Sequence, residues 1–283
     1  MNTSQQRDHV RDKVIIVTGA GGGFGSRVSA SAAARGANLV CADVDETAAG
    51  RTASSITASG GSAIALAVDV RSMSQMRALA SAAVERFGRV DVMVNNAGVM
   101  PLAFFADHEA ALAAWHDCID INFKGVLNGM VAVYDTMIAQ GRGQVINLSS
   151  IYGNFPVAGA GVYGATKAAV NVLSESLRVE SRGRIKVTTI KPTGVPGTGL
   201  SAGIVNREAI VGILGQNTAD FFEKRIAFQE GRLDPALLDP ARPGYTFLDP
   251  SFIAEAIVHA IDQPWGVSIG EITVRATGDH FVL

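Results

Sequence analysis

The sequence predicts an α/β protein whose mostly parallel, seven-stranded sheet is doubly wound, with helices on both faces. Short runs of β-branched residues alternate with longer alanine-rich helical stretches, which is typical of a parallel sheet covered on both sides. The segment Val14–Val17 is apolar without interruption, as expected of a strand buried on both faces. Because neither a linker nor an internal repeat interrupts this pattern, we expect one domain over residues 1–283.

The strands are expected, in chain order, at short apolar runs over 14–17, 39–42, 63–70, 90–94, 144–148, 185–190 and 269–274. Longer alanine-rich stretches predict helices over 25–35, 46–59, 72–87, 109–137, 163–181 and 251–262. The fourth helix should break near Asn122, and Gly60 and Gly61 end the second. Over 191–250 Pro, Gly and Phe mix with short helical pieces, which indicates a lid or substrate-binding insertion.

Composition excludes several classes of protein. Hydrophobic residues make up 48% of the chain and charged residues 18%, so a large core can form and disorder is excluded for most of it. A net charge of -2 without a basic patch argues against nucleic acid or a membrane surface as partner. The start, Met1–Asp12, is a polar tail without a signal peptide's apolar stretch. Because Cys41 and Cys118 are isolated, we expect no disulfide framework and a cytoplasmic location.

A glycine-rich turn, Thr18-Gly-Ala-Gly-Gly-Gly-Phe-Gly25, follows the first strand and opens a helix. Glycines let the backbone approach a pyrophosphate closely, and the helix N-terminus offers free N–H groups to it. The position between strand and helix therefore predicts a Rossmann-type dinucleotide site. The cofactor contacts expected in this turn are Gly19, Gly23, Phe24 and Gly25. A tight turn that binds no ligand is the alternative.

An acidic residue, Asp43, ends the second strand about 20 residues beyond the turn, where a carboxylate can accept hydrogen bonds from the adenosine ribose. Asp43 would repel the extra phosphate of NADP, and the turn itself contains no Arg or Lys, although Arg27 follows in the helix. NAD is therefore favoured over NADP. Alternatively, Asp43 is a helix N-cap in the turn Asp43-Val44-Asp45.

Tyr163 and Lys167 lie four residues apart, so that on a helix both side chains share one face. A free tyrosine has a pKa of about 10, too high for an efficient base near neutral pH. A nearby ammonium, joined by the positive nicotinamide of NAD, stabilises the phenolate and lowers that pKa. Taken alone, the spacing often occurs by chance, and a surface or snorkelling pair would be the better interpretation. However, the strand ending at Ser149 and Ser150 leaves a hydroxyl at the carboxyl edge of the sheet.

Together these segments resemble the short-chain dehydrogenase/reductase family. Over residues 14 to about 198 the matching pieces follow the family's order and spacing: Thr18–Gly25, Asp69–Val70, Asn95–Gly98, Asn122, Ser150, Tyr163 and Lys167. The resemblance implies that Tyr163 is the acid/base and that Ser150, which has the family's spacing to it, hydrogen-bonds the substrate oxygen. Lys167 would hold the nicotinamide ribose and depress the pKa of Tyr163. Asn122 would kink its helix and position a water that links Lys167 to solvent.

The resemblance also implies further cofactor contacts: Val44, Asp69, Val70, Asn95, Ala97, Gly98, Pro192, Val195 and Thr198. Asp69 would supply a side-chain acceptor for adenine, and Val195 would meet the carboxamide through its backbone. Asn95 has a structural role as an equal alternative. After the sixth strand the chain departs from the family's Pro-Gly, because Thr193 replaces the glycine and Thr198 arrives one position late.

The substrate pocket is expected from Ser150, Ile151, Asn154, Phe155, Val157, Leu200 and residues of 191–250. These are mainly apolar, which favours a hydrophobic secondary alcohol or ketone, alicyclic or steroid-like. Phe221, Phe222, Ile226 and Phe228 form a lid, an oligomer contact or ordinary core. The scattered histidines predict no catalytic metal.

The sequence therefore predicts an NAD-dependent oxidoreductase. The alternatives are a 3-oxoacyl-thioester reductase and, from another class, a sensor that binds NAD(H) without catalysis. The partners expected are a small-molecule substrate and further copies of the chain. The resemblance implies a homo-oligomer, tetramer or dimer, that packs through the helix around 122–137 and the helix bearing Tyr163.

Overall fold

Seven strands form one sheet in the computed structural model, which describes residues 8–282. The strands are β1 (Val14–Thr18), β2 (Asn38–Asp43), β3 (Ser62–Ala67), β4 (Val92–Asn95), β5 (Gly143–Leu148), β6 (Ile185–Pro192) and β7 (Glu271–Val274). Their order is β3-β2-β1-β4-β5-β6-β7, and every neighbouring pair is parallel. The predicted doubly wound fold is confirmed, and the sheet is parallel throughout rather than mostly so. The order reverses between β1 and β4, where such sheets bind ligands.

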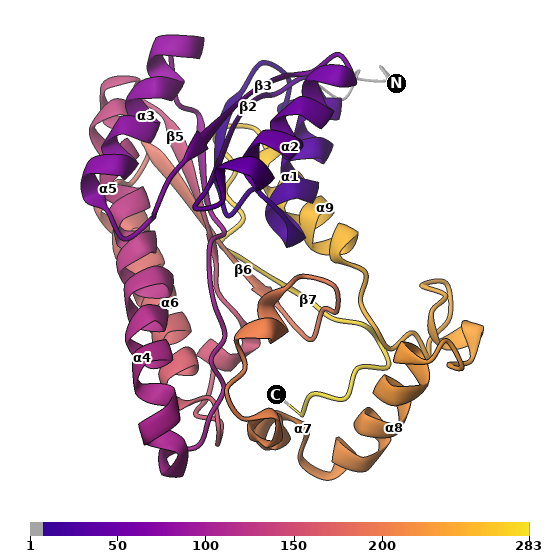
Figure 1. Cartoon of the computed structure of the whole chain (residues 1–283). Coiled ribbons are helices and arrows are strands. Elements are labelled where there is room, and N and C mark those ends of the chain that lie inside the picture. Colours follow the sequence, from indigo (N-terminus) through magenta and orange to yellow (C-terminus); the bar gives the residue numbers. More distant parts are fainter. Residues whose placement is uncertain (1–7, 283) are drawn as a thin grey trace.

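Helices cover both faces of the sheet (Figure 1). The helices α1 (Gly23–Ala34), α2 (Glu46–Ala58) and α9 (Pro250–Ile261) pack on one face. On the other lie α3 (Met73–Phe87), α5 (Gly125–Ala139) and α6 (Gly161–Glu180), with α4 (His108–Ile119) beside α6. Side chains alternate along each strand, so Ile15 and Val17 of β1 join the first layer and Val14 and Ile16 the second. The uninterrupted apolar run of β1 therefore follows from burial on both faces.

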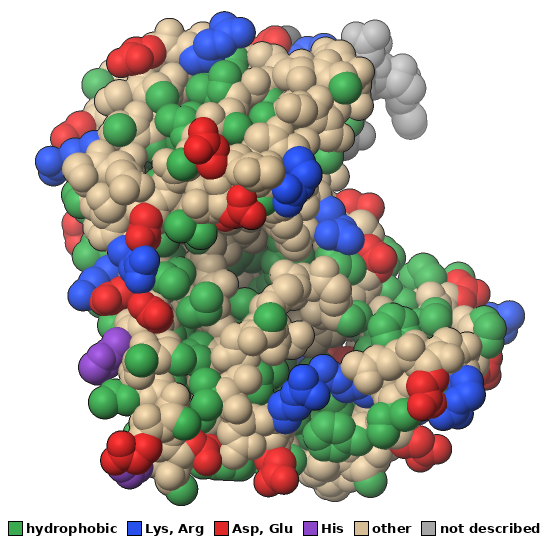
Figure 2. All heavy atoms as spheres, viewed as in Figure 1, with side chains coloured by type: hydrophobic (Ala, Val, Ile, Leu, Met, Phe, Trp, Pro, Cys, Tyr) green, Lys and Arg blue, Asp and Glu red, His purple; other side chains and the backbone are tan. Residues whose placement is uncertain are grey.

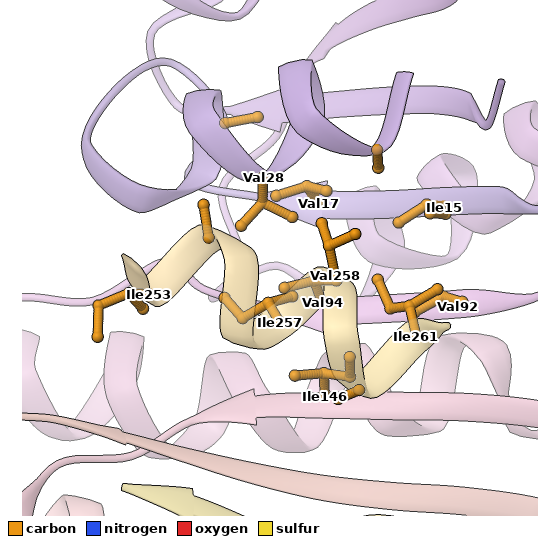
Figure 3. Packing of buried hydrophobic residues seen from close by; sticks show 14 of the residues in the cluster. Ile15, Val17, Val28, Val92, Val94, Ile146, Ile253, Ile257, Val258 and Ile261 are labelled. Carbon is orange, nitrogen blue, oxygen red and sulfur yellow. The ribbon is translucent and has the colours of Figure 1, made fainter. Parts of the chain in front are cut away.

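The last helix, α9, fastens the carboxyl-terminal part of the chain to the centre of the sheet. Ile253, Ile257 and Ile261 recur every four residues and are fully buried. Figure 3 shows this side of α9 lying against side chains of β1, β4 and β5, with Val28 of α1 above it. Burial of each such side chain contributes about 1.5–3 kcal/mol.

The helix expected over 109–137 is divided in two. A π-helical segment, Asp120–Lys124, separates α4 from α5 and contains Asn122. The break predicted near Asn122 is therefore confirmed. Such single turns widen the helix by one residue and often occur at functional sites.

The region from 191 to 250 forms short elements rather than a regular layer. It contains α7 (Val211–Leu214), α8 (Thr218–Gln229) and 3₁₀ turns at Leu200–Gly203, Arg207–Ile210, Gly215–Asn217 and Pro235–Leu237. The chain beyond β7 returns to this region, where the N–H of Val282 binds the carbonyl of Ile213. Asn217 also donates to the carbonyl of His280. The last residues thus hold α7 and α8 in place.

The start of the described chain is packed. Val10 is fully buried, and Asp8 pairs with Arg35 at 2.9 Å. The polar tail expected over residues 1–12 is thus anchored to the fold at residues 8 and 10, and residues 1–7 lie outside the described part of the chain. Within residues 8–282, no helix combines the length and apolarity needed to cross a membrane.

Candidate active site

A pocket of about 660 Å³ opens at the carboxyl ends of the strands. In Figure 2 the surface is hollowed between the part that contains α1 and α2 and the part that contains α7 and α8. The glycine turn and the ends of β2, β4 and β5 supply one side of the lining, and residues of 192–229 and 246–281 supply the other. The volume is in the range that binds whole cofactors and substrates.

The glycine turn fits a dinucleotide diphosphate. Gly19 and Gly23 have φ of 65° and 53°, which only glycine adopts without strain, and both line the pocket. No described side chain caps the start of α1, so its first N–H groups are free for an anion. Phe24 also lines the pocket, as predicted. Gly25, in contrast, does not line the pocket. A Cβ at this position would lie 2.2 Å from the carbonyl oxygen of Gly19, so the glycine lets the turn close.

Asp43 lines the pocket at the end of β2 and stiffens the turn. Its Oδ2 accepts from the N–H of Gly21 at 2.8 Å, and its Oδ1 accepts from the N–H of Asp45 at 3.0 Å. The N-cap of α2 is Asp45, which accepts from Ala48, so the N-cap alternative for Asp43 is wrong. Val44 is 73% exposed and lines the pocket beside it.

Asp69 and Val70 line the same end. Both carboxylate oxygens of Asp69 accept from Arg71, which also pairs with Asp117 at 3.0 Å. The hydrogen bond from Arg71 holds the pKa of the Asp69 carboxyl below its usual range. The acceptor expected for adenine is therefore already bound to a guanidinium.

The two asparagines that end β4 have different tasks. Asn95 is buried, and its Nδ2 donates to Oδ1 of Asn147 at 2.8 Å, away from the pocket. The expected cofactor contact by Asn95 is wrong, and the structural alternative holds. Asn96, which the sequence reasoning missed, lines the pocket and binds the carbonyls of Thr18 and Gly19 at 2.8 and 3.1 Å. Ala97 and Gly98 line it as expected.

Tyr163 and Lys167 occupy successive turns at the start of α6, and both line the pocket. The ammonium of Lys167 lies 5.8 Å from the centroid of the Tyr163 ring and donates to the carbonyl of Leu148 at 2.8 Å. The ring of Tyr152 packs edge-on against that of Tyr163, with centroids 5.5 Å apart. The surface-pair alternative is therefore wrong, because the two side chains are only 3% and 5% exposed.

Burial dominates the electrostatics of this pair. It raises the pKa of the Tyr163 phenol above its ordinary value, while a hydrogen bond with Ser150 acts in the opposite direction. Burial lowers the pKa of Lys167 to about 8. The spacing of Tyr163 and Lys167 predicts a lowered phenol pKa, but these two residues alone do not lower it.

The neighbouring serines at the end of β5 point to different partners. Ser149 donates to the carbonyl of Lys167 at 3.1 Å and thereby joins β5 to α6. Ser150 accepts from the N–H of Tyr152, and its interaction with the Tyr163 phenol opposes the rise in the pKa of that phenol. Both serines line the pocket with Tyr163, and Ser150, chosen from its spacing, stays the predicted partner of the substrate oxygen.

Asn122 is fully buried at the π-helical segment. Its side chain binds both the N–H and the carbonyl of Val99, at 2.9 and 2.8 Å. A Cβ at Gly98 would lie 3.2 Å from Oδ1 of Asn122 and 3.6 Å from Nζ of Lys167. The glycine therefore keeps space open between these two polar groups.

The loop after β6 passes over the glycine turn. Pro192, Thr193, Val195 and Thr198 line the pocket. The carbonyl oxygen of Thr198 would lie 2.9 Å from a Cβ at Gly23, so the loop and the turn are in close contact. The hydroxyl of Thr193, which replaces a glycine of the family pattern, is buried with no hydrogen-bond partner among the described residues. The altered motif thus still lines the pocket beside the glycine turn.

The substrate side was predicted only in part. Ile151 and Leu200 line the pocket, but Phe155 is 61% exposed and does not, so its assignment is wrong. Asn154 and Val157 are also outside the lining. Arg225, Thr246 and Phe247 line it from within the predicted region 191–250, whereas Tyr152, His280 and Phe281 were not predicted. Those after β7 follow no motif, and only the return of the chain brings them to the pocket.

Comparisons with known proteins give a consistent result. Residues 13–209 match the family described as short chain dehydrogenase. An uncharacterised oxidoreductase of Listeria innocua is 35% identical over 95% of this chain and 98% of its own. A 7α-hydroxysteroid dehydrogenase complexed with NADH and 7-oxo glycochenodeoxycholic acid is 25% identical with a TM-score of 0.77, covering 96% of this chain and 97% of its own. A metagenomic short-chain oxidoreductase in complex with NADP is 25% identical with a TM-score of 0.71, covering 95% and 99%.

Proposed function

The chain belongs to the short-chain dehydrogenase family and is an oxidoreductase that acts on CH–OH groups with a nicotinamide dinucleotide, and on this premise we propose its substrate type, cofactor preference and acid/base. The substrate is a hydrophobic secondary alcohol or ketone, alicyclic or steroid-like. NAD is the preferred cofactor, and Tyr163 is the acid/base. The observation that supports this most is the meeting of Ser150, Tyr163 and Lys167 in the pocket that the glycine turn also lines.

The side chains divide the work as follows. A bound nicotinamide dinucleotide would supply the hydride acceptor for an alcohol carbon or the hydride donor for a ketone. Oη of Tyr163 takes the proton of the substrate hydroxyl, and Oγ of Ser150 hydrogen-bonds the same oxygen. The ammonium of Lys167, held by the carbonyl of Leu148, favours the phenolate of Tyr163. Because the site is buried, these charges are weakly screened.

The preference for NAD rests on Asp43. Its carboxylate lines the adenosine end and is fixed there by two backbone N–H groups. A second phosphate on the ribose would meet this negative charge. Arg71 also lines that end, but its guanidinium is bound to Asp69 and Asp117.

The substrate type rests on the pocket wall. Many residues on the second side of the pocket are apolar: Leu200, Ile204, Ile210, Phe221, Phe228, Phe247 and Phe281. Such a wall suits a hydrophobic ring system. The hydroxysteroid dehydrogenase in the comparisons, which binds a bile acid, is consistent with this proposal.

A homo-oligomer, tetramer or dimer, and a cytoplasmic location complete the proposal. On α4, α5 and α6, which lie on one side of the molecule (Figure 1), large apolar side chains are exposed: Leu112, Leu127, Val131, Val172 and Val179. Association would cover them. Cys41 and Cys118 are free thiols, as expected of a reducing compartment.

The test is the variant Tyr163→Phe, assayed with alicyclic and steroid alcohols and ketones at the nicotinamide absorbance. Loss of the acid/base should lower kcat/KM by about 100- to 10,000-fold. Calorimetric titration with NADH should give nearly the wild-type affinity. The control is Tyr134→Phe, because Tyr134 packs in the core layer behind the sheet, away from the pocket. Full activity in Tyr163→Phe would refute the assignment.

A further inference from the structure

One face of α8 forms part of the substrate side of the pocket. Phe221, Arg225, Phe228 and Gln229 line the pocket, and their spacing of four, three and one residues places them on one side of the helix. Figure 1 shows α8 on the far side of the molecule from α6, which bears Tyr163. The two helices thus supply opposite walls, and this face contains one cation.

The guanidinium of Arg225 is not neutralised within the described residues. Of the three Lys and Arg side chains in the pocket lining, Lys167 binds the carbonyl of Leu148 and Arg71 binds two carboxylates. Arg225 has no carboxylate within ion-pair distance in residues 8–282, and its guanidinium lies 5.9 Å from the ring of Phe221. Asp220, which lies on the same helix, is already bound by Lys224 and by His280.

This charge constrains what the pocket can hold. A ligand that fills the pocket displaces the water around the half-buried guanidinium. A neutral apolar ligand would leave that cation without acceptors, which costs free energy. A carboxylate would replace the water with two parallel hydrogen bonds that match the planar guanidinium.

We propose that the substrate is an alicyclic hydroxy or keto acid whose carboxylate binds Arg225 while its alcohol or carbonyl carbon lies at Tyr163. A single guanidinium matches a monoanion, and the surrounding wall of Leu200, Phe228 and Phe247 accepts the hydrocarbon between the two polar ends. The inference rests on the proposed function and narrows its substrate class.

The test compares keto acids with their methyl esters, which keep the ketone and remove the charge. The probes are 4-oxocyclohexanecarboxylate and a steroid keto acid, each beside its ester, with NADH. For at least one pair, we expect the wild-type enzyme to have a kcat/KM about 10- to 100-fold higher for the acid, as a charged hydrogen-bonded contact provides. The variant Arg225→Gln should abolish most of this ratio, and Arg225→Lys should retain part of it.

The matched control is Arg232→Gln, which removes an equal charge just beyond α8, where Arg232 pairs with Glu230 outside the pocket lining. It should leave the acid-to-ester ratio unchanged. Equal rates for acid and ester in the wild type, or an unchanged ratio in Arg225→Gln, would overturn the anion site and leave the oxidoreductase assignment standing. No turnover of any ketone or ester would instead contradict the proposed function, and the inference with it.

Discussion

At the scale of single residues, Asp43 has a structural task beside the selective one that we propose for it. Its two carboxylate oxygens bind the N–H groups of Gly21 and Asp45, so the charge proposed to exclude a second phosphate also fixes the glycine turn. A Cβ at Gly21 would lie 2.8 Å from Oδ2 of Asp43, which shows how closely the turn approaches the carboxylate. A substitution that keeps the shape of the Asp43 side chain but removes its charge therefore separates the two tasks.

In Asp43→Asn, the ratio of kcat/KM for NADP to that for NAD should rise by about 10- to 100-fold, because the repulsion of a second phosphate is removed. Stability should fall by about 1 kcal/mol, since one amide oxygen can satisfy only one of the two N–H groups. Initial rates with both cofactors and urea unfolding measure the two effects. Asp45→Asn is the control, because asparagine caps a helix as well as aspartate does. An unchanged cofactor ratio in Asp43→Asn would contradict the role of Asp43 in the preference for NAD.

The two asparagines after Val94 show what a motif does and does not specify. Strand alternation places Asn95 on the same face as Met93, which belongs to the layer under α5, and leaves Asn96 free to turn to the glycine loop. The motif predicted that the segment borders the cofactor but not which asparagine does so. For Phe155 and Arg225 no periodicity was available, because the path of a loop and the tilt of a short helix depend on packing.

At the scale of elements, periodicity predicted the seven strands and the helices that cover them, with ends that shift by a few residues. The helix α1, for example, begins at Gly23 rather than Gly25. Over 191–250 the helices are short, and one face of α8 lines a pocket instead of packing into the core. The apolar residues of this region therefore lack the regular helical spacing that those of α9 show.

Helix α5 offers a test of how closely a helix packs on the sheet. A Cβ at Gly129 would lie 1.9 Å from Oδ1 of Asn95, an atom that is buried without a hydrogen-bond partner among the described residues. Gly129→Ala should therefore destabilise the protein by about 1–3 kcal/mol through overpacking, although alanine favours a helix over glycine.

The control is Gly50→Ala in α2, where a Cβ would have no atom within 4 Å. There the gain in helix propensity should appear undiminished, as a stabilisation of about 1 kcal/mol. If packing decides the outcome, urea unfolding should show a lower free energy of unfolding for Gly129→Ala and a higher one for Gly50→Ala. Stabilisation in Gly129→Ala would show that α5 lies farther from β4 than the structure has it.

At the scale of the whole molecule, three buried lysines end on backbone carbonyls rather than on carboxylates. Lys13 binds the carbonyl of Ile261 at 2.8 Å, Lys167 that of Leu148 at 2.8 Å and Lys186 that of Gln263 at 3.1 Å. Burial lowers the pKa of each from 10.5 to about 8, with Lys186 adding repulsion at Lys13. These amines lie in different parts of the fold, so their effect on stability is collective.

The direction in which the free energy of unfolding changes with pH follows from proton linkage. Between the folded pKa of about 8 and the ordinary 10.5, the unfolded chain binds more protons than the folded one, so the free energy of unfolding rises with pH. Below pH 8 the lysines are charged in both states, and the full cost of burying the charge is present. Buried thiols oppose the rise, because burial raises the pKa of Cys41 from 9.0 to about 11 and also raises that of Cys118. Above pH 9 the unfolded chain therefore loses thiol protons first.

The urea midpoint, measured in reducing buffer, should consequently rise between about pH 7.5 and 9 and level off above it. In Cys41→Ala one opposing thiol is removed, so the rise should continue to a higher pH than in the wild type. In Lys186→Met the rise should be shallower, because one of the three amines no longer titrates. A midpoint that falls steadily between pH 8 and 9 in the wild type would mean that these amines stay solvated, and the packing of Lys13 and Lys186 under Trp265 would need revision.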